Sequence, residues 1–261
     1  MISGHFVQSQ QGKVFVSRFG EQHSHTGVLI LPPLFEEMNL SRAVLAKVAQ
    51  HIAASGTAVY MMDYAGTGDS EGEIDEVDSE LWLQNTLDVG HWLSQQGVDQ
   101  IILLGVRFGA LLQLHFQQSL HNAFNIKAQI VWKPLTSGKN LSNQLLRLKH
   151  TNHVLAGGEK VDWRGRIQQG ETIEVAGYPI NERLLSSIEA LALSPELAPL
   201  SALDWLELGT KMLSPALGKF QQGWPQVRFS PIAGQTFWQS PDIYAEPALY
   251  QIHKEIISRY E

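Results

Sequence analysis

The sequence predicts an α/β fold with a mostly parallel central sheet flanked by helices. Short apolar runs alternate with segments of helical periodicity along most of the chain. These runs are hydrophobic at nearly every position, which is typical of strands buried on both faces of a parallel sheet. The chain has 261 residues, of which 44% are hydrophobic and 17% charged, so it can bury a large core within one domain.

The first predicted elements are a β-hairpin, a buried strand and a helix. Two β-prone clusters, at residues 6–7 and 14–16, lie on either side of Gly12, where the chain can turn. The run Gly27–Leu31 reads GVLIL and stops at two prolines, as expected of a strand without a polar face. Apolar residues at helical spacing between Ser41 and Ala54 then predict a helix.

The middle of the chain continues the alternation of strands and helices. In order, we expect a strand at 58–63, a helix capped by Asp78 and Ser79 and running to about Gln95, a strand at 101–106, a helix at 107–120 and a strand at 128–132. Repeated strand–helix units of this kind pair in parallel and place helices on both faces of the sheet.

The alternation is interrupted between residues 136 and 180. Apolar runs are short there, and four glycines break the pattern. We interpret 136–180 as a small lid or insertion in a single domain whose α/β core comprises 1–135 and 181–261. In the second part of that core we expect a helix at 181–191, strands at 203–208 and 227–232, and a last helix from about 247 to 260.

Composition and charge exclude several classes of protein. The 19 basic and 26 acidic side chains give a net charge of −7, which excludes a basic nucleic-acid clamp. The chain has no cysteine and therefore no disulfide, cysteine nucleophile or thiolate zinc site. Two histidine pairs, His23 with His25 and His150 with His153, lack a third ligand at metal-site spacing, so we expect neither a metal nor a cofactor.

The beginning of the chain bears on its location. The first residues show no basic stretch followed by an apolar segment, and no window holds eighteen uninterrupted apolar residues. Secretory leaders and membrane-spanning helices need such segments. We therefore expect a cytoplasmic protein that does not insert into a membrane.

The strand at 101–106 runs directly into Gly105-Val106-Arg107-Phe108-Gly109 and a helix. This strand–turn–helix context with two glycines is that of a nucleophile elbow, whose middle residue is exposed at the top of the sheet. Here the middle residue is Arg107. A guanidinium that stays protonated cannot attack a carbonyl, so Arg107 is not a nucleophile.

Several motifs resemble one known group of proteins. The order of elements, the elbow and the DYAGTGDS segment at 63–70 are similar to the α/β-hydrolase superfamily. Three segments more narrowly resemble the exosortase-A-system-associated hydrolases of type 2, namely PPLFEEMN at 32–39, GVRFG at 105–109 and WKPLTSGK at 132–139. The resemblance covers most of the chain except the predicted lid, and it implies an α/β-hydrolase fold and a link to bacterial exopolysaccharide production. That branch also has Arg at the elbow.

The other two members of a catalytic triad can be checked in chain order. In α/β-hydrolases an acid follows the nucleophile, and a histidine comes last. The nearest carboxylate at the strand 203–208 is Glu207, since Asp204 comes a little early. The segment after the strand 227–232 contains Phe237 and Trp238 but no histidine, and His253 lies too far along. A serine-hydrolase proton relay cannot be assembled from these residues.

The expected oxyanion hole leaves two alternatives for Arg107. The backbone N–H of Phe108 and one from Leu34 or Phe35 can form the hole, and together with Arg107 they would suit a carboxylate or phosphate. The alternative is an internal ion pair of Arg107 with Glu36 or Glu37 in the facing loop.

One further motif, Gly68-Asp69-Ser70-Glu71-Gly72, formally fits the pattern of a hydrolase nucleophile. No strand enters Ser70 and no helix leaves it, so we interpret the motif as a turn with local hydrogen bonds.

Two functions remain open. The first is a pseudoenzyme that acts as a binding or accessory factor for a small anionic or glycan-like ligand, or for a protein partner. The second is an unconventional hydrolase acting on an ester or glycan-type bond, with Glu37 or Glu207 as general acid or base and Arg107 as an electrophilic clamp. The candidate catalytic residues are Arg107, Glu37 and Glu207, and the candidate ligand-binding residues are Leu34, Phe35, Glu36, Asn39, Phe108 and Trp238.

Overall fold

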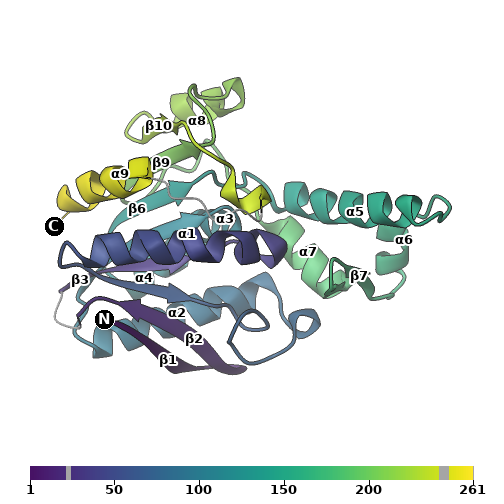
Figure 1. Cartoon of the computed structure of the whole chain (residues 1–261), viewed down its shortest axis with the longest axis horizontal. Helices are drawn as coiled ribbons and strands as arrows, with labels where there is room; N and C mark the ends of the chain where they lie inside the picture. Colours follow the sequence, from purple (N-terminus) through teal and green to yellow (C-terminus); the bar gives the residue numbers. More distant parts are fainter. Residues whose placement is uncertain (22–24, 241–246, 261) are drawn as a thin grey trace.

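The computed structural model describes residues 1–21, 25–240 and 247–260, and its centre is an eight-stranded sheet (Figure 1). The strands of this sheet are β1 (Ile2–Ser9), β2 (Gly12–Phe19), β3 (Thr26–Leu31), β4 (Ala58–Met62), β5 (Gln100–Val106), β6 (Ile126–Trp132), β9 (Ala202–Leu208) and β10 (Arg228–Ile232). Their spatial order is β1-β2-β4-β3-β5-β6-β9-β10. β1 and β2 pair antiparallel, as do β2 and β4, whereas the remaining neighbours are parallel. The predicted mostly parallel sheet is confirmed.

Helices cover both faces of the sheet. They are α1 (Phe35–Ala53), α2 (Ser79–Gln95), α3 (Phe108–His115), α4 (Gln117–Ala123), α5 (Gly138–Leu155), α6 (Trp163–Gln168), α7 (Glu182–Ala190), α8 (Gly218–Gly223) and α9 (Pro247–Ser258). Short 3₁₀ turns lie at Ile74–Glu76, Pro215–Leu217 and Phe237–Gln239. α1 and α9 share one apolar core with the sheet, and α2 and α3 share another on the opposite face.

β3 shows why the central strands are apolar at every position. Its Leu29 and Leu31 belong to the core beneath α2, whereas Val28 and Ile30 belong to the core beneath α1. Because successive side chains point to opposite faces, a strand with helices on both sides has no position open to water.

Two helix predictions need correction. The predicted helix from Ser41 begins six residues earlier, at Phe35, so α1 includes the acidic residues that follow the two prolines. The helix predicted at 107–120 is two helices, α3 and α4, which meet at Phe116. The cap predicted for α2 is confirmed, because the Asp78 carboxylate accepts a hydrogen bond from the Leu81 N–H.

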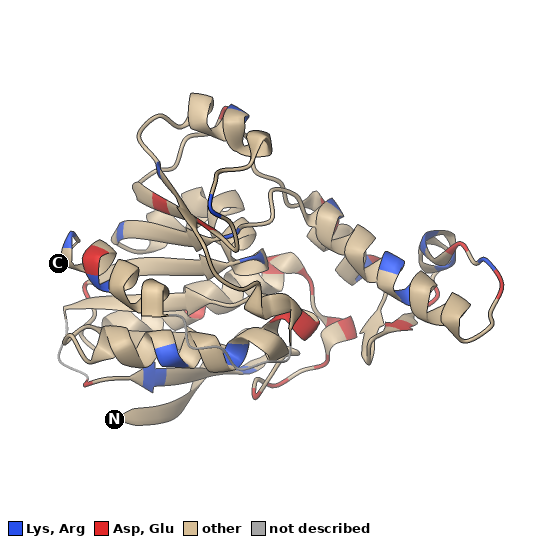
Figure 2. Ribbon diagram, turned by 45° about the horizontal axis from the view of Figure 1, so that its top comes forward, with Lys and Arg blue, Asp and Glu red and all other residues tan. Residues whose placement is uncertain are grey.

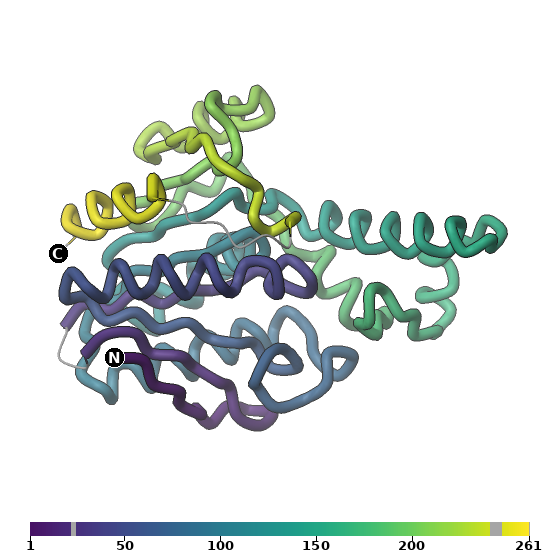
Figure 3. The backbone as a smooth tube through the Cα atoms, in the orientation of Figure 1, coloured from purple at the N-terminus to yellow at the C-terminus, as the bar shows by residue number. Residues whose placement is uncertain are grey.

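Residues 136–180 form an arm that projects from the sheet (Figure 3). It consists of α5, α6 and a small hairpin of β7 (Ile173–Val175) and β8 (Tyr178–Ile180). The sequence did not predict the 18-residue helix α5, whose exposed positions are mostly polar but include Leu148, Val154 and Leu155. Leu141 and Leu145 of α5 pack into the core beneath α2. None of the helices in the described ranges is apolar over a length that could cross a bilayer.

Candidate functional site

The turn between β5 and α3 has the strained backbone expected of an elbow. Arg107 lies between these elements with a φ of 53° and a ψ of −107°, a region that residues with a side chain rarely adopt. A Cβ atom on Gly109 would lie 2.0 Å from the Leu31 carbonyl oxygen, and one on Gly105 would lie 2.5 Å from the Ala110 Cα atom. Both glycines are therefore needed for β5, α3 and the end of β3 to approach one another.

The Arg107 side chain is engaged inside the protein. Its Nε atom donates to both carboxylate oxygens of Glu37, at 3.1 and 3.2 Å, and Nη2 donates to Oε1 at 2.9 Å. Nη1 donates to the Lys133 carbonyl oxygen at 3.0 Å, and the guanidinium carbon lies 5.3 Å from the Trp238 ring. With 8% of its side chain exposed, Arg107 forms the internal ion pair that was one of the two alternatives, and its partner is Glu37.

A second ion pair lies beside the first. Glu207, at the end of β9, pairs with Lys133 and accepts a hydrogen bond from the Trp205 Nε1 atom at 3.1 Å. Lys133 directly follows β6, which lies between β5 and β9 in the sheet. Following the sheet order, Glu37 comes after β3, Arg107 after β5, Lys133 after β6 and Glu207 at the end of β9. The two cations therefore lie between the two carboxylates, and the four formal charges cancel.

Lys133 was not among the predicted site residues, and the feature that marks it is found only in the structure. Its backbone φ is 41°, and the backbone φ of Phe35 is 56°. With Arg107, three of the four non-glycine residues of positive φ in the described chain lie after β3, β5 and β6, at the same edge of the sheet. Such strained residues cluster at functional sites, but their backbone angles are not visible in a sequence.

A small groove borders the Arg107–Glu37 pair. Its volume is about 130 Å³, and it lies between the start of α1 and the arm. The groove is lined by Leu34, Phe35, Glu36, Glu37, Leu141, Gln144, Leu145 and Leu148. Four predicted site residues, Leu34, Phe35, Glu36 and Glu37, therefore meet in one place.

Asn39 connects α1 to the arm. Its Nδ2 atom donates to the Tyr178 hydroxyl oxygen at 2.9 Å and to a Glu36 carboxylate oxygen at 3.2 Å. The Tyr178 ring also meets Phe35 edge-on, with 5.2 Å between ring centroids. Asn39 and Phe35 thus hold the hairpin of the arm against the rim of the groove.

The other two predicted ligand-binding residues are buried. The Phe108 ring packs edge-on against Trp82 and Tyr64, beneath the elbow. Trp238 lies against Phe237 and the Arg107 guanidinium and is 3% exposed. The ring of Trp238 covers the guanidinium, and neither aromatic side chain lines the groove.

His253 is a core residue. Its Nδ1 atom lies 2.6 Å from the Leu249 carbonyl oxygen, and its Nε2 atom lies 2.9 Å from the Trp132 Nε1 atom. An indole N–H can only donate, so Nε2 accepts and the proton of a neutral ring lies on Nδ1. Burial lowers the pKa of His253 from 6.5 to about 4. Both nitrogens are used, so His253 is not a catalytic base.

Two more acidic or hydroxyl candidates are structural. The Ser70 hydroxyl donates to the Asp63 carbonyl oxygen at 2.6 Å and accepts from the Phe15 N–H at 2.8 Å, which confirms the turn. Asp204 accepts from the Tyr260 hydroxyl at 2.7 Å and from Arg259 at 3.1 Å, so it binds the end of the chain.

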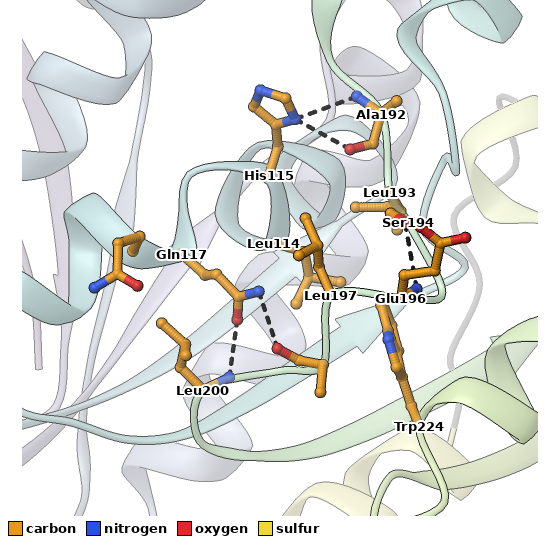
Figure 4. Close-up of a pocket in the computed structure, with 12 residues that line it drawn as sticks. Leu114, His115, Gln117, Ala192, Leu193, Ser194, Glu196, Leu197, Leu200 and Trp224 are labelled. Atoms are coloured by element: carbon orange, nitrogen blue, oxygen red, sulfur yellow. Dashed lines mark hydrogen bonds between the residues drawn. The ribbon is translucent and has the colours of Figure 1, made fainter.

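A larger hollow of about 370 Å³ lies away from the elbow, beside the end of α3 (Figure 4). The polar groups around it are engaged with their neighbours. Gln117 donates to the Ala198 carbonyl oxygen at 3.3 Å and accepts from the Leu200 N–H at 2.9 Å, and His115 contacts Ala192. The described residues contain no group of three histidines or carboxylates placed to hold a metal ion.

Comparisons with known proteins identify the architecture. No protein-family model matches the sequence, and neither does any curated protein. Among solved structures, the chain resembles Est1E from Butyrivibrio proteoclasticus, with 16% identity over 98% of each chain and a TM-score of 0.74. It also resembles mouse alpha/beta hydrolase domain-containing protein 10, with 18% identity over 99% of this chain and 100% of the other, and a TM-score of 0.64.

A third similar structure is XC6422 from Xanthomonas campestris, described as an α/β serine hydrolase without a lid. The identity is 12% over 99% of this chain and 94% of the other, and the TM-score is 0.60. At these identities the likeness concerns the fold, not the activity. Together with the parallel sheet, the flanking helices and the elbow after β5, these matches show that the chain has the α/β-hydrolase fold.

Proposed function

We propose that this protein is a binding or accessory factor built on the α/β-hydrolase fold, without serine-hydrolase activity. The observation that carries the proposal is the buried, multiply hydrogen-bonded pair of Arg107 and Glu37 at the elbow. A protonated guanidinium at the nucleophile position cannot start acyl transfer, and residues 233–239 offer no histidine as a base.

The groove beside the pair favours a glycan-like ligand over a simple anion. An anion would have to displace Glu37 from Arg107 and leave a carboxylate buried without its partner, which is costly. The groove instead offers apolar walls together with the polar side chains of Glu36 and Gln144. Sugars present both C–H faces and hydroxyl groups. At about 130 Å³ the groove is smaller than the typical ligand site of roughly 300 Å³ or more, so it would hold one sugar unit of a longer chain.

The resemblance to exosortase-A-system-associated proteins supports a place in exopolysaccharide systems. The segments that carry this resemblance include residues 32–39 and 132–139, and these contribute Glu37 and Lys133 to the two ion pairs. The ligand we propose is therefore a unit of a bacterial exopolysaccharide.

Esterase assays test the absence of catalysis. We expect p-nitrophenyl esters from acetate to octanoate to be hydrolysed at the buffer rate by both the wild type and Arg107→Ala. The competing hypothesis assigns acid–base work to Glu37 or Glu207 and clamping to Arg107. Turnover by the wild type would overturn our proposal. Its loss in Arg107→Ala, with the variant shown to be folded by circular dichroism, would support the competing hypothesis.

Ligand binding is tested separately by thermal shift and calorimetry with glucose, glucuronate and glucose 1-phosphate. We expect binding of a sugar to weaken in Gln144→Ala, because Gln144 lines the groove. The matched control is Gln118→Ala, an exposed glutamine at the hollow beside α3. Equal loss in both variants, or loss only in the control, would contradict the proposed groove.

A further inference from the structure

The edge strand β1 lacks the features that usually protect a sheet edge. Among the described strands, β1 is paired with β2 alone. Exposed edges in soluble proteins are generally interrupted by charged residues, proline or a bulge. β1 reads ISGHFVQS over eight residues and contains no charged residue and no proline. The opposite edge strand, β10, has five residues and includes Arg228 and Pro231.

One face of β1 is also apolar and uncovered. Val7 and Ser9 point toward α2, and the Ser9 hydroxyl donates to Asp88 of that helix. On the other face, Ile2 is 57% exposed and Phe6 is 60% exposed. Figure 1 shows β1 at the border of the molecule, and Figure 2 shows it free of acidic or basic colouring.

The surface beside Ile2 is hollowed as well as apolar. A depression of about 320 Å³ separates the start of β1 from the end of α1. It is lined by Met1, Ile2, Phe19, Gly20, Gln50, Ala53 and Ala54. Among the described residues, this corner of the molecule therefore leaves apolar surface exposed to water.

The direction of the backbone groups of β1 follows from one hydrogen bond. The Gly20 N–H donates to the Met1 carbonyl oxygen at 3.0 Å, so Met1 and Gly20 form a hydrogen-bonded pair. Antiparallel ladders alternate hydrogen-bonded and non-hydrogen-bonded pairs. The backbone groups of the odd-numbered residues of β1 therefore face β2, and those of Ile2, Gly4 and Phe6 face outward.

We infer that β1 pairs antiparallel with β1 of a second copy of this chain, about a two-fold axis at Gly4. In this register Ile2 of each copy lies opposite Phe6 of the other. All of these residues have outward-facing backbone groups, so the pairs are of the hydrogen-bonded type. The exposed side chains of both copies then form one apolar cluster on the same face of a continuous sheet.

The second copy is favoured over other strands because the edge is complementary to itself. An isologous contact needs each residue to match its symmetry partner, and here two apolar residues match and glycine meets glycine. No charge is brought opposite a like charge within the strands. Each copy carries a net charge of −7, but this charge is spread over the molecule and is screened by salt.

The first test measures molecular mass by size-exclusion chromatography with light scattering, on C-terminally tagged protein over a wide range of concentrations. We expect a concentration-dependent dimer for the wild type and a monomer for Phe6→Lys. The control Leu197→Lys changes an apolar residue that is 68% exposed on another surface, and it should dimerise as the wild type does. Thermal denaturation of Phe6→Lys checks that it is folded. A monomeric wild type, or a Phe6→Lys variant as dimeric as the wild type, overturns the inference.

The second test fixes the register and uses the absence of natural cysteines. Opposed residues in a hydrogen-bonded pair lie about 5.5 Å apart at Cα, within reach of a disulfide. The two copies of Ile2, like the two copies of Phe6, lie four residues apart along the ladder, roughly 14 Å. A mixture of Ile2→Cys and Phe6→Cys chains should therefore crosslink on mild oxidation, and neither chain should do so alone. Crosslinking of Phe6→Cys by itself would overturn this register.

Discussion

At the scale of single residues, Arg107 occupies the middle position of the elbow, and its side chain is buried against its neighbours. Its guanidinium donates hydrogen bonds to the Glu37 carboxylate and the Lys133 carbonyl oxygen, and it lies over the ring of Trp238. A buried charge pair contributes little net stability when it is complete, but the loss of one partner leaves the other charge unpaired.

We predict that Arg107→Ala lowers the free energy of unfolding by about 3 kcal/mol, because Glu37 is left without its partner in a largely buried place. Arg107→Met with Glu37→Leu removes both charges and should be less destabilising than Arg107→Ala alone. The control Arg166→Ala breaks an exposed pair with Glu171 and should cost about 1 kcal/mol or less. Urea denaturation measures all three, and a loss in Arg107→Ala no greater than in the control would contradict the prediction.

His253 gives a pH dependence of known sign. Its pKa is about 4 in the folded protein and 6.5 when unfolded, so the unfolded chain binds the proton more readily. The folded state is therefore favoured most above pH 6.5, where His253 is neutral in both states. As the pH falls from 6.5 toward 4, protonation of His253 in the unfolded chain lowers the free energy of unfolding.

We predict that the free energy of unfolding falls by about 2 kcal/mol between pH 7 and pH 5 because His253 takes up a proton only in the unfolded chain. His253→Gln cannot take up this proton. It should be less stable than the wild type at pH 7, since it disturbs the contact with Trp132, but its stability should fall less steeply with acid. Urea denaturation at three pH values gives the slopes, and parallel slopes for the two proteins would rule the explanation out.

At the scale of elements, the sequence predicted the core strands well and the arm poorly. Strands such as β3 and β5 are apolar at successive positions because helices cover both faces, and this pattern is local. α5 packs only its first leucines against the core and extends beyond it, so most of its residues are polar. Apolar residues at helical spacing therefore extend over only the first turns of α5, which is too few to predict the whole helix from the sequence.

The hairpin of β7 and β8 offers a test of local backbone strain. Its two-residue turn is Ala176-Gly177, with φ values of 50° and 85°, as in a type I′ turn. Asparagine tolerates this conformation better than alanine does. We predict that Ala176→Asn stabilises the protein by about 0.5–1 kcal/mol, seen as a higher melting temperature. Ala156→Asn, at an ordinary φ of −81°, should give no gain, and equal effects of the two changes would contradict this account.

At the scale of the whole molecule, the sheet order decides which charged residues meet. Arg107 was predicted at the site from its local motif, but the pair of Lys133 with Glu207 exists because β6 lies beside β9. The residues of a strand do not indicate which other strand lies beside it in the sheet. The choice of Glu37 rather than Glu36 likewise depends on the earlier start of α1, because consecutive side chains of a helix point about 100° apart. Glu37 thus pairs with Arg107, whereas Glu36 accepts a hydrogen bond from Asn39.

The arm is joined to the body near the groove by Tyr178, whose ring and hydroxyl contact Phe35 and Asn39. We predict that Tyr178→Ala increases hydrogen exchange in α5 and in β7–β8, while β5 and β6 stay protected. Tyr178→Phe keeps the ring contact and loses one hydrogen bond, so it should have a much smaller effect. Mass spectrometry of exchanged peptides separates the two variants, and uniform exchange changes across the sheet would refute the prediction.

The elbow has a further use as a starting point for enzyme design. Its left-handed backbone is maintained by the close approach of Gly105 and Gly109 to neighbouring chain, whatever side chain stands between them. The elbow backbone thus has the shape needed to hold a reactive side chain at position 107. Because the chain has no cysteine, no thiol would compete with a residue introduced there. Arg107→Ser with Glu37→Gln, followed by a histidine placed among residues 233–239, would test how few changes give this fold the residues of a serine esterase.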